Sequence, residues 1–218
     1  MNLRVSHQKT AALTLVEVLV VIFVGAVFML VILPALTRKP TQTQRIYCFN
    51  NLKQINLAYL MWAGDHNGNF PMQVSVTNGG TMELNADGSK AWLNYLVMSN
   101  ELSRPNYLVC PADTNRVALY SNIGFSAKNI SYFVGLDAST NHPQMFLSGD
   151  DNFAIGGVPV KPGLLAVSTN TPITWTASRH VKVGNIGLAD GSVASVTDPG
   201  LTNFLHQTGV ATNHLAIP

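Results

Sequence analysis

Three sets of side chains in this sequence have types and spacings that could do chemistry, and they lie far apart along the chain. One is a carboxylate within an apolar stretch, one is a pair of thiols, and one is a histidine followed after nine residues by Asp-Gly. The residues are Glu17, then Cys48 and Cys110, then His180 with Asp190 and Gly191. They could support charge pairing in a membrane, disulfide formation, and metal binding or acid–base catalysis.

Glu17 is the only charged residue in the 24-residue stretch 13–36, which also contains Pro34. As a helix this stretch would be about 36 Å long, enough to cross the hydrocarbon core of a bilayer. A carboxylate there is costly and tends to mark function. Cleavage after Ala12 would give it a partner, because the new α-amino group of Leu13 carries a positive charge. The alternative is a plain signal anchor whose glutamate reaches toward lipid headgroups.

Cys48 and Cys110 are the only cysteines in the chain. In an oxidising compartment an isolated pair suggests a disulfide, which we expect to join a helix to the sheet. Closing a loop of this length would add roughly 4 kcal/mol of stability on the chain-entropy model. Two buried thiols are the alternative. A Cys-His nucleophile is disfavoured because no catalytic sequence motif accompanies either cysteine.

His180 and Asp190 allow a metal-binding or an acid–base interpretation, but we favour a structural one. Residues 184–189 can form a strand and residues 192–196 the returning strand. Asp190 and Gly191 then form the turn between them, with the aspartate at positive φ.

Asp150 and Asp151 follow a glycine and could supply oxygen ligands for calcium. Adjacent carboxylates in a turn are more often solvated, and the twelve-residue EF-hand pattern does not follow. We therefore expect no cofactor or metal. The sequence also contains no phosphate-binding loop, G-x-S-x-G elbow or HExxH helix, so nothing in it indicates an enzyme.

The overall composition indicates what kind of protein carries these residues. Charged residues make up 11% of the 218 residues and apolar ones 47%, which predicts a neutral surface of the extracytoplasmic kind. Without Arg4 and Lys9, which precede the apolar stretch, the chain is formally neutral. Nucleic-acid binding needs clustered basic residues, so no nucleic-acid partner is expected.

Hydrophobic periodicity predicts an α+β protein. After the leader (1–12) and the transmembrane helix (13–36), the helix continues through 37–70 as an amphipathic segment. Its apolar stripe, at steps of three and four, is Cys48, Leu52, Ile55, Tyr59 and Trp62. Beyond it, 71–218 is expected to be a β-rich head, because Asn-Gly at 78–79 and Asp-Gly at 87–88 and 190–191 are hairpin turn pairs. The amphipathic helix would pack on the antiparallel sheet of this head.

The run from Ala12 to Glu17 resembles the type IV prepilin processing motif, in which a small residue precedes the cut and a glutamate is fifth after it. The short basic leader, Glu17 and the run LTLVEVLVVI carry this resemblance. It implies cleavage between Ala12 and Leu13 by a prepilin peptidase and methylation of the new amine. It also implies that Glu17 neutralises the amine of a neighbouring subunit. The sequence departs from the usual pattern in having Ala12 where glycine is usual and Leu13 where phenylalanine is usual.

A second resemblance covers the head. The stretch 48–71, the run Cys-Pro-Ala-Asp at 110–113, and His180 with Asp190-Gly191 are together similar to the H-x9-DG group of pilin-like secretion proteins. This resemblance implies the pilin-like fold of a type II secretion pseudopilin.

We therefore expect a structural subunit of a pilus or secretion fibre, held in the inner membrane by a single pass with its head outside the cytoplasm. Its implied partners are other pilin-like subunits, the prepilin peptidase and an inner-membrane assembly platform. One alternative is a membrane-tethered binding module, which would expose Trp92, Trp175 and tyrosine residues for stacking. The other is a tethered hydrolase, in which His180 and Asp190 would converge in a cleft.

Overall fold

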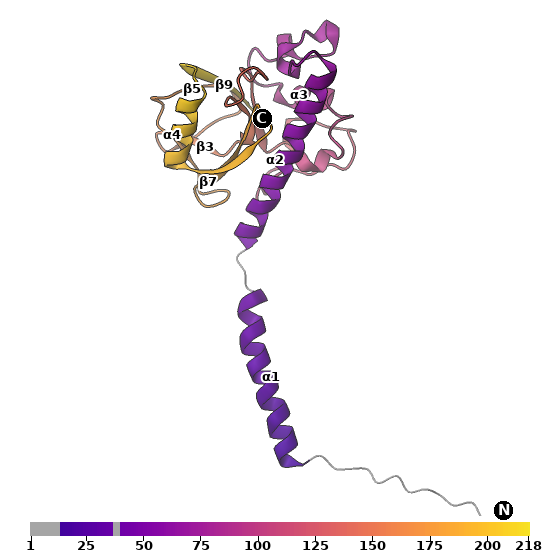
Figure 1. Cartoon of the computed structure of the whole chain (residues 1–218), viewed down its shortest axis with the longest axis vertical. Helices are drawn as coiled ribbons and strands as arrows, with labels where there is room; N and C mark the ends of the chain where they lie inside the picture. Colours follow the sequence, from indigo (N-terminus) through magenta and orange to yellow (C-terminus); the bar gives the residue numbers. More distant parts are fainter. Residues whose placement is uncertain (1–13, 37–39) are drawn as a thin grey trace, which may run out of the picture. The chain divides into compact units, whose positions relative to one another are not determined.

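The computed structural model describes residues 14–36 and 40–218 (Figure 1). The chain divides into two compact units, Met1–Lys39 and Pro40–Pro218. The described residues form four α-helices, several 3-10 turns and two antiparallel sheets. The predicted α+β class with an antiparallel sheet is therefore confirmed.

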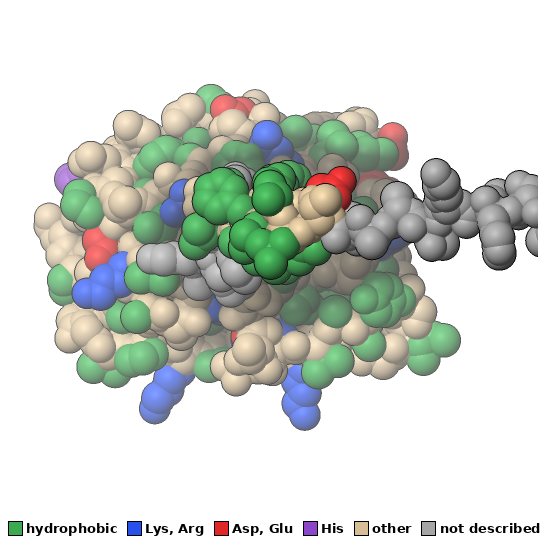
Figure 2. Space-filling view, turned by 90° about the horizontal axis from the view of Figure 1, so that it is seen from below, with side chains coloured by type: hydrophobic (Ala, Val, Ile, Leu, Met, Phe, Trp, Pro, Cys, Tyr) green, Lys and Arg blue, Asp and Glu red, His purple; other side chains and the backbone are tan. Residues whose placement is uncertain are grey.

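The first unit contains helix α1 (Leu15–Leu36), which lies within the predicted apolar stretch. Its side chains are described for 15–30 and for Ile32; nearly all are apolar and all are exposed (Figure 2). Across the part of the chain that the structure describes, no helix combines the length and hydropathy needed to cross a membrane. The predicted leader and the junction at 37–39 lie outside the described residues.

Helix α2 (Pro40–Asp65) opens the second unit and carries the predicted apolar stripe. All five stripe residues are at most 3% exposed. The helix ends where the turn-rich sequence predicts, because Asn67 and Gly68 adopt positive φ and the Gly68 amide donates to the Ala63 carbonyl at 2.8 Å.

The main sheet has six strands in the order β5-β9-β1-β2-β7-β8, all paired antiparallel. Helix α2 contacts β2, β7 and β8 and covers the larger of the two cores. The strands are β1 (Tyr132–Gly135), β2 (Phe146–Asp150), β5 (Gly163–Ser168), β7 (Val183–Leu188), β8 (Val193–Thr197) and β9 (Thr212–Ile217).

A smaller sheet and the last helix enclose the second core. The sheet has the order β4-β3-β6, and helix α4 contacts β6 and β8. The core between them includes Phe153, Trp175, Leu201 and Leu205. The elements are β3 (Phe153–Ile155), β4 (Val158–Pro159), β6 (Ile173–Trp175) and α4 (Asp198–Gln207).

Two of the three predicted hairpin turns are wrong. Gly79 (φ 87°) ends a 3-10 turn at Val76–Asn78, and Gly88 (φ 71°) precedes helix α3 (Ala91–Val97). In the described chain the first strand is β1. The other 3-10 turns of the head are Pro71–Gln73, Met82–Leu84, Pro105–Leu108 and Ala127–Asn129.

Buried side-chain hydrogen bonds organise this strand-free region. The Thr81 hydroxyl donates to Asn94 Oδ1 at 2.5 Å, and Asn94 Nδ2 donates to Asn85 Oδ1 at 2.8 Å. Asn85 in turn donates to the Thr81 carbonyl at 2.9 Å. These bonds satisfy buried hydroxyl and amide side chains and the Thr81 carbonyl in a region that has no strand ladder.

Candidate functional site

Glu17 takes part in a reciprocal hydrogen-bond pair at the start of α1. The Thr14 amide donates to Glu17 Oε2 at 3.0 Å, and the Glu17 amide donates to Thr14 Oγ1 at 3.3 Å. This is a capping box, which satisfies backbone N–H groups that have no partner within the helix. The signal for it, Thr-x-x-Glu before an apolar run, is in the sequence, but interpreting the glutamate only as a charge misses it. Ala12 and Leu13 lie outside the described residues.

Cys48 and Cys110 form a disulfide, with their Cα atoms 5.2 Å apart. Both are fully buried. The bond joins α2 to the segment after the 3-10 turn Pro105–Leu108, so the expected proximity of the two cysteines is confirmed. The partner element is a loop, whereas the sequence predicted the sheet.

His180 lies against this disulfide. Its Nε2 atom is 3.2 Å from Cys110 Sγ and 3.9 Å from Asp150 Oδ2. The imidazole side chain is completely buried. Sequence spacing could not show this arrangement, because the disulfide, Asp150 and His180 come from segments far apart in the chain.

The backbone that presents His180 is strained. His180, Val181 and Lys182 have φ values of 52°, 51° and 59°. The left-handed region costs a residue other than glycine about 1–2 kcal/mol, and such strain clusters at functional sites. His180 is buried while Val181 is 66% exposed. The strained backbone therefore places the imidazole ring in the interior and the next side chain in solvent.

Burial shifts the titration of both polar members of the cluster. It raises the pKa of Asp150 to about 6 and lowers the pKa of His180 to about 4. The imidazole is therefore neutral at pH 7, and its approach to Asp150 is not an ion pair. Asp150 Oδ2 accepts hydrogen bonds from Asn185 N at 2.8 Å and Asn185 Nδ2 at 2.9 Å. Within the described chain, Asp150 Oδ1 and His180 Nδ1 have no hydrogen-bond partner.

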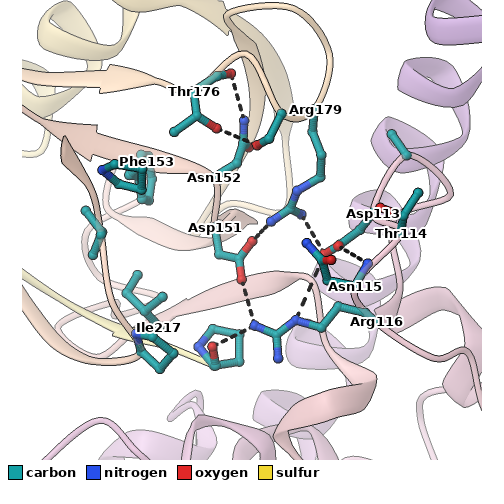
Figure 3. Close-up of a pocket in the computed structure, with 16 residues that line it drawn as sticks. Asp113, Thr114, Asn115, Arg116, Asp151, Asn152, Phe153, Thr176, Arg179 and Ile217 are labelled. Carbon is teal, nitrogen blue, oxygen red and sulfur yellow. Dashed lines mark hydrogen bonds and ion pairs between the residues drawn. The ribbon is translucent and has the colours of Figure 1, made fainter. Parts of the chain in front are cut away.

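A polar cleft of about 540 Å³ contains a four-residue ion-pair network (Figure 3). Arg179 pairs with Asp151 and with Asp113, the latter at 3.4 Å. Arg116 approaches Asp151 at 3.5 Å and Asp113 at 4.0 Å. Two carboxylates and two guanidinium groups neutralise each other, so this network is built to hold loops together. Sequence reasoning missed it, although Arg179 precedes the motif histidine and Asp113 belongs to the Cys-Pro-Ala-Asp run.

This network argues against calcium at Asp151. Both carboxylate oxygens of Asp151 face guanidinium groups, Oδ1 that of Arg179 and Oδ2 that of Arg116. A calcium ion would have to displace these cations.

The predicted hairpin at Asp190-Gly191 is confirmed, with β7 and β8 as its strands. Gly191 has φ 87°, but Asp190 does not have positive φ, so that part of the prediction is wrong. Asp190 acts through its side chain, whose Oδ1 accepts from the Ser192 amide at 2.8 Å. Its carboxylate is thus engaged in the turn, while His180 contacts Asp150 and the disulfide. The contacts of the two residues give no support to a shared hydrolytic site.

The two tryptophans differ from the binding-module expectation, whereas Tyr47 and Tyr120 are exposed as it requires. Trp175 is buried and stacks on Phe153 with ring centroids 4.8 Å apart. Trp92 is half-buried and meets Phe125 edge-on. The Trp175 indole is therefore not free to stack on a ligand. Comparisons with protein-family models, with curated proteins and with solved structures find no match to this chain.

Proposed function

We propose that this chain is a structural subunit, a pseudopilin, of a type IV pilus-like or type II secretion fibre. The main support for this proposal is the position of Glu17, which is fifth after Ala12 and lies in the first turn of an apolar helix. In this proposal a prepilin peptidase cuts between Ala12 and Leu13. The mature chain stays in the inner membrane, with its head outside the cytoplasm, until an assembly platform adds it to the fibre.

The exposed apolar surface of α1 supports this proposal. The described side chains of α1 are exposed on every face of the helix, and most of them are Val, Leu, Ile, Phe or Met. A helix that is apolar all round is normally buried in a large core or in lipid. Lipid before assembly and neighbouring copies of α1 after assembly would cover this surface.

The construction of the head supports a structural role. The apolar stripe of α2 lies on an antiparallel sheet, and the disulfide at Cys48 fastens the helix near its start. Asp190 and Gly191 form a hairpin turn, and the arginine and aspartate network joins loops. Cys48, Cys110, Asp113 and Asp190, which lie in the stretches that resemble the H-x9-DG group, thus have structural contacts.

The N-terminus of the mature protein tests the proposal directly. We expect N-terminal sequencing and intact mass, on protein from cells with an active prepilin peptidase, to show a chain beginning at Leu13 with a methylated amine. Cells lacking the peptidase provide the control and should yield the uncut chain. An intact Met1 in both strains, or a cut after Leu36, would contradict the proposal.

A further inference from the structure

Four potential metal ligands meet in the head. The Sγ atoms of Cys48 and Cys110, a carboxylate oxygen of Asp150 and a ring nitrogen of His180 all lie within 4.8 Å of one another. All four residues are buried. They come from α2, from the loop after Pro105–Leu108, from the end of β2 and from the strained run before β7, so the fold as a whole assembles the cluster.

We propose that the reduced form of this cluster binds one Zn²⁺ ion through Cys48, Cys110, His180 and Asp150. Two thiolates, one imidazole and one carboxylate are ligands that zinc accepts in tetrahedral sites. The proposal concerns the head alone and does not depend on fibre assembly.

The spacing of the side chains suits such an ion. Zinc–ligand bonds of about 2.0–2.3 Å in a tetrahedron place neighbouring ligand atoms about 3.3–3.8 Å apart. The observed separations from His180 Nε2 are 3.2 Å to Cys110 Sγ and 3.9 Å to Asp150 Oδ2. The two sulfur atoms must move apart once the bond between them is broken, and the four ligand atoms already lie within 4.8 Å of one another.

Unsatisfied polar atoms point to the same use of the cluster. Asp150 Oδ1 is buried and has no hydrogen-bond partner among the described residues, while Oδ2 is held by Asn185. A buried carboxylate oxygen without a partner is costly, and a cation bound by the Asp150 carboxylate would reduce that cost.

The redox step is a two-electron exchange. A dithiol donates two electrons and two protons to the disulfide, so that the Cys48–Cys110 bond breaks, two thiols form and the dithiol becomes a cyclic disulfide. Zn²⁺ then displaces the two thiol protons, which leave to solvent. The oxidised head therefore has no thiolate ligands, and the reduced head has two.

The test uses the full chain in detergent, reduced with a dithiol that is then removed under anaerobic gel filtration. Co²⁺ replaces Zn²⁺ as the spectroscopic probe. We expect one Co²⁺ per reduced chain, with thiolate charge-transfer and tetrahedral d–d bands, and no such bands from the oxidised chain. Zn²⁺ should displace the cobalt. Absence of the bands from the reduced chain, or equal bands from the oxidised chain, would overturn the proposal.

Ligand identity is tested by substitution and by a measurement on the unaltered chain. His180→Gln and Asp150→Asn should each weaken Co²⁺ binding at least about tenfold, while His142→Gln, at an exposed histidine, should leave it unchanged. X-ray absorption of the zinc-loaded wild-type chain should show two sulfur neighbours at about 2.3 Å and two nitrogen or oxygen neighbours at about 2.0–2.2 Å. A different sulfur count, or wild-type binding by both variants, would refute the assignment.

Discussion

Asp150 and His180 share one buried site but respond to protons in opposite directions. Burial raises the pKa of Asp150 from 3.8 to about 6, so its contribution to stability is full below about pH 4 and is lost as the pH rises to 6. Burial lowers the pKa of His180 from 6.5 to about 4, so its contribution is full above about pH 6.5 and is lost as the pH falls to 4. Between pH 4 and 6 the two effects oppose each other.

Removing either residue should expose the pH dependence of the other. For Asp150→Asn, stability relative to wild type should fall as the pH is lowered from 7 to 4.5; for His180→Gln it should rise. Each change is at most about 3 kcal/mol, because one pKa unit is worth about 1.4 kcal/mol. Urea unfolding of the oxidised, metal-free chain measures it. Asp190→Asn, at an exposed turn, is the control. Parallel pH profiles for all variants would contradict the prediction that Asp150 and His180 have opposite effects on stability.

In the proposed assembly Glu17 caps helix α1 and also pairs its charge with a neighbouring amine. Three substitutions distinguish these two roles. Glu17→Gln keeps a side chain able to complete the capping box but removes the charge, Glu17→Ala removes both, and Thr14→Ala breaks the cap while keeping the charge. If the charge pairs with a neighbouring amine, both Glu17 variants lose fibres and Thr14→Ala keeps them, because a buried amine left without its partner typically costs about 3–5 kcal/mol.

The yield of sheared fibres, normalised to the membrane level of each variant, is the measurement for Glu17. Normal fibre yield from Glu17→Gln, with loss from Thr14→Ala, would assign Glu17 to the helix cap alone. Head melting should be the same for all three variants.

At the scale of elements, a buried asparagine fastens α2 to the sheet. Asn56 Nδ2 donates to the carbonyls of Leu188 and Ser192, each at 3.3 Å, and Asn56 Oδ1 accepts from the Ser148 hydroxyl at 2.7 Å. Its amide fits only because the facing position on β7 is Gly187: a Cβ there would lie 2.4 Å from Asn56 Nδ2. The missing side chain on β7 therefore lets one residue bridge α2, β2 and the β7–β8 hairpin.

Gly187→Ala should destabilise the head by about 1–3 kcal/mol, because the added methyl group displaces Asn56 from its three bonds. Gly64→Ala is the matched control. Gly64 is exposed on α2 with open space around its Cβ position, so the change should stabilise by about 0.5–1 kcal/mol. Chemical denaturation of both variants and wild type gives the comparison. Equal stability of Gly187→Ala and wild type would show that Asn56 is not the fastening point.

The elements that sequence could predict are those whose signal is local and repeated. The stripe on α2 recurs over several turns, and Asp190-Gly191 lies between two short runs that can form strands, so both were predictable. Asn78-Gly79 and Asp87-Gly88 carry the same turn signal but lie beside 3-10 turns, because a dipeptide specifies a turn without specifying the elements on either side of it. The cluster at His180 was not predictable, since its members meet only through pairing of distant segments.

At the scale of the whole molecule, the chain separates into two units, and the second has its own cores. We expect residues 40–218, expressed alone and oxidised, to unfold in the same calorimetric transition as the head of the full chain. The reason is that the buried residues of both cores lie after Pro40. A transition lowered by more than about 5 °C, which corresponds to roughly 1–2 kcal/mol, would show that residues before Pro40 contribute to the head.

The disulfide should stabilise the head beyond the burial of its two cysteines in the larger core. Its cysteines are 62 residues apart, and the chain-entropy model assigns about 4 kcal/mol to closing such a loop. Replacing both cysteines with serine should lower the unfolding free energy by about that amount, and dithiol treatment of wild type should produce a similar loss. A loss of unfolding free energy below about 1 kcal/mol would mean that residues 48 and 110 stay close together in the unfolded chain even without the disulfide.

The same crosslink also determines which part of the chain can carry mechanical load. If tension is applied between the start of α2 and the C-terminus, force entering at Cys48 passes through the sulfur atoms to Cys110. The 62-residue loop between them carries no tension. At about 3.3–3.6 Å per extended residue, the crosslink withholds about 200 Å of contour length from an oxidised molecule. Single-molecule stretching should therefore show the reduced head lengthening by about that much more than the oxidised head. A fibre built from oxidised subunits would resist pulling with less extension per subunit.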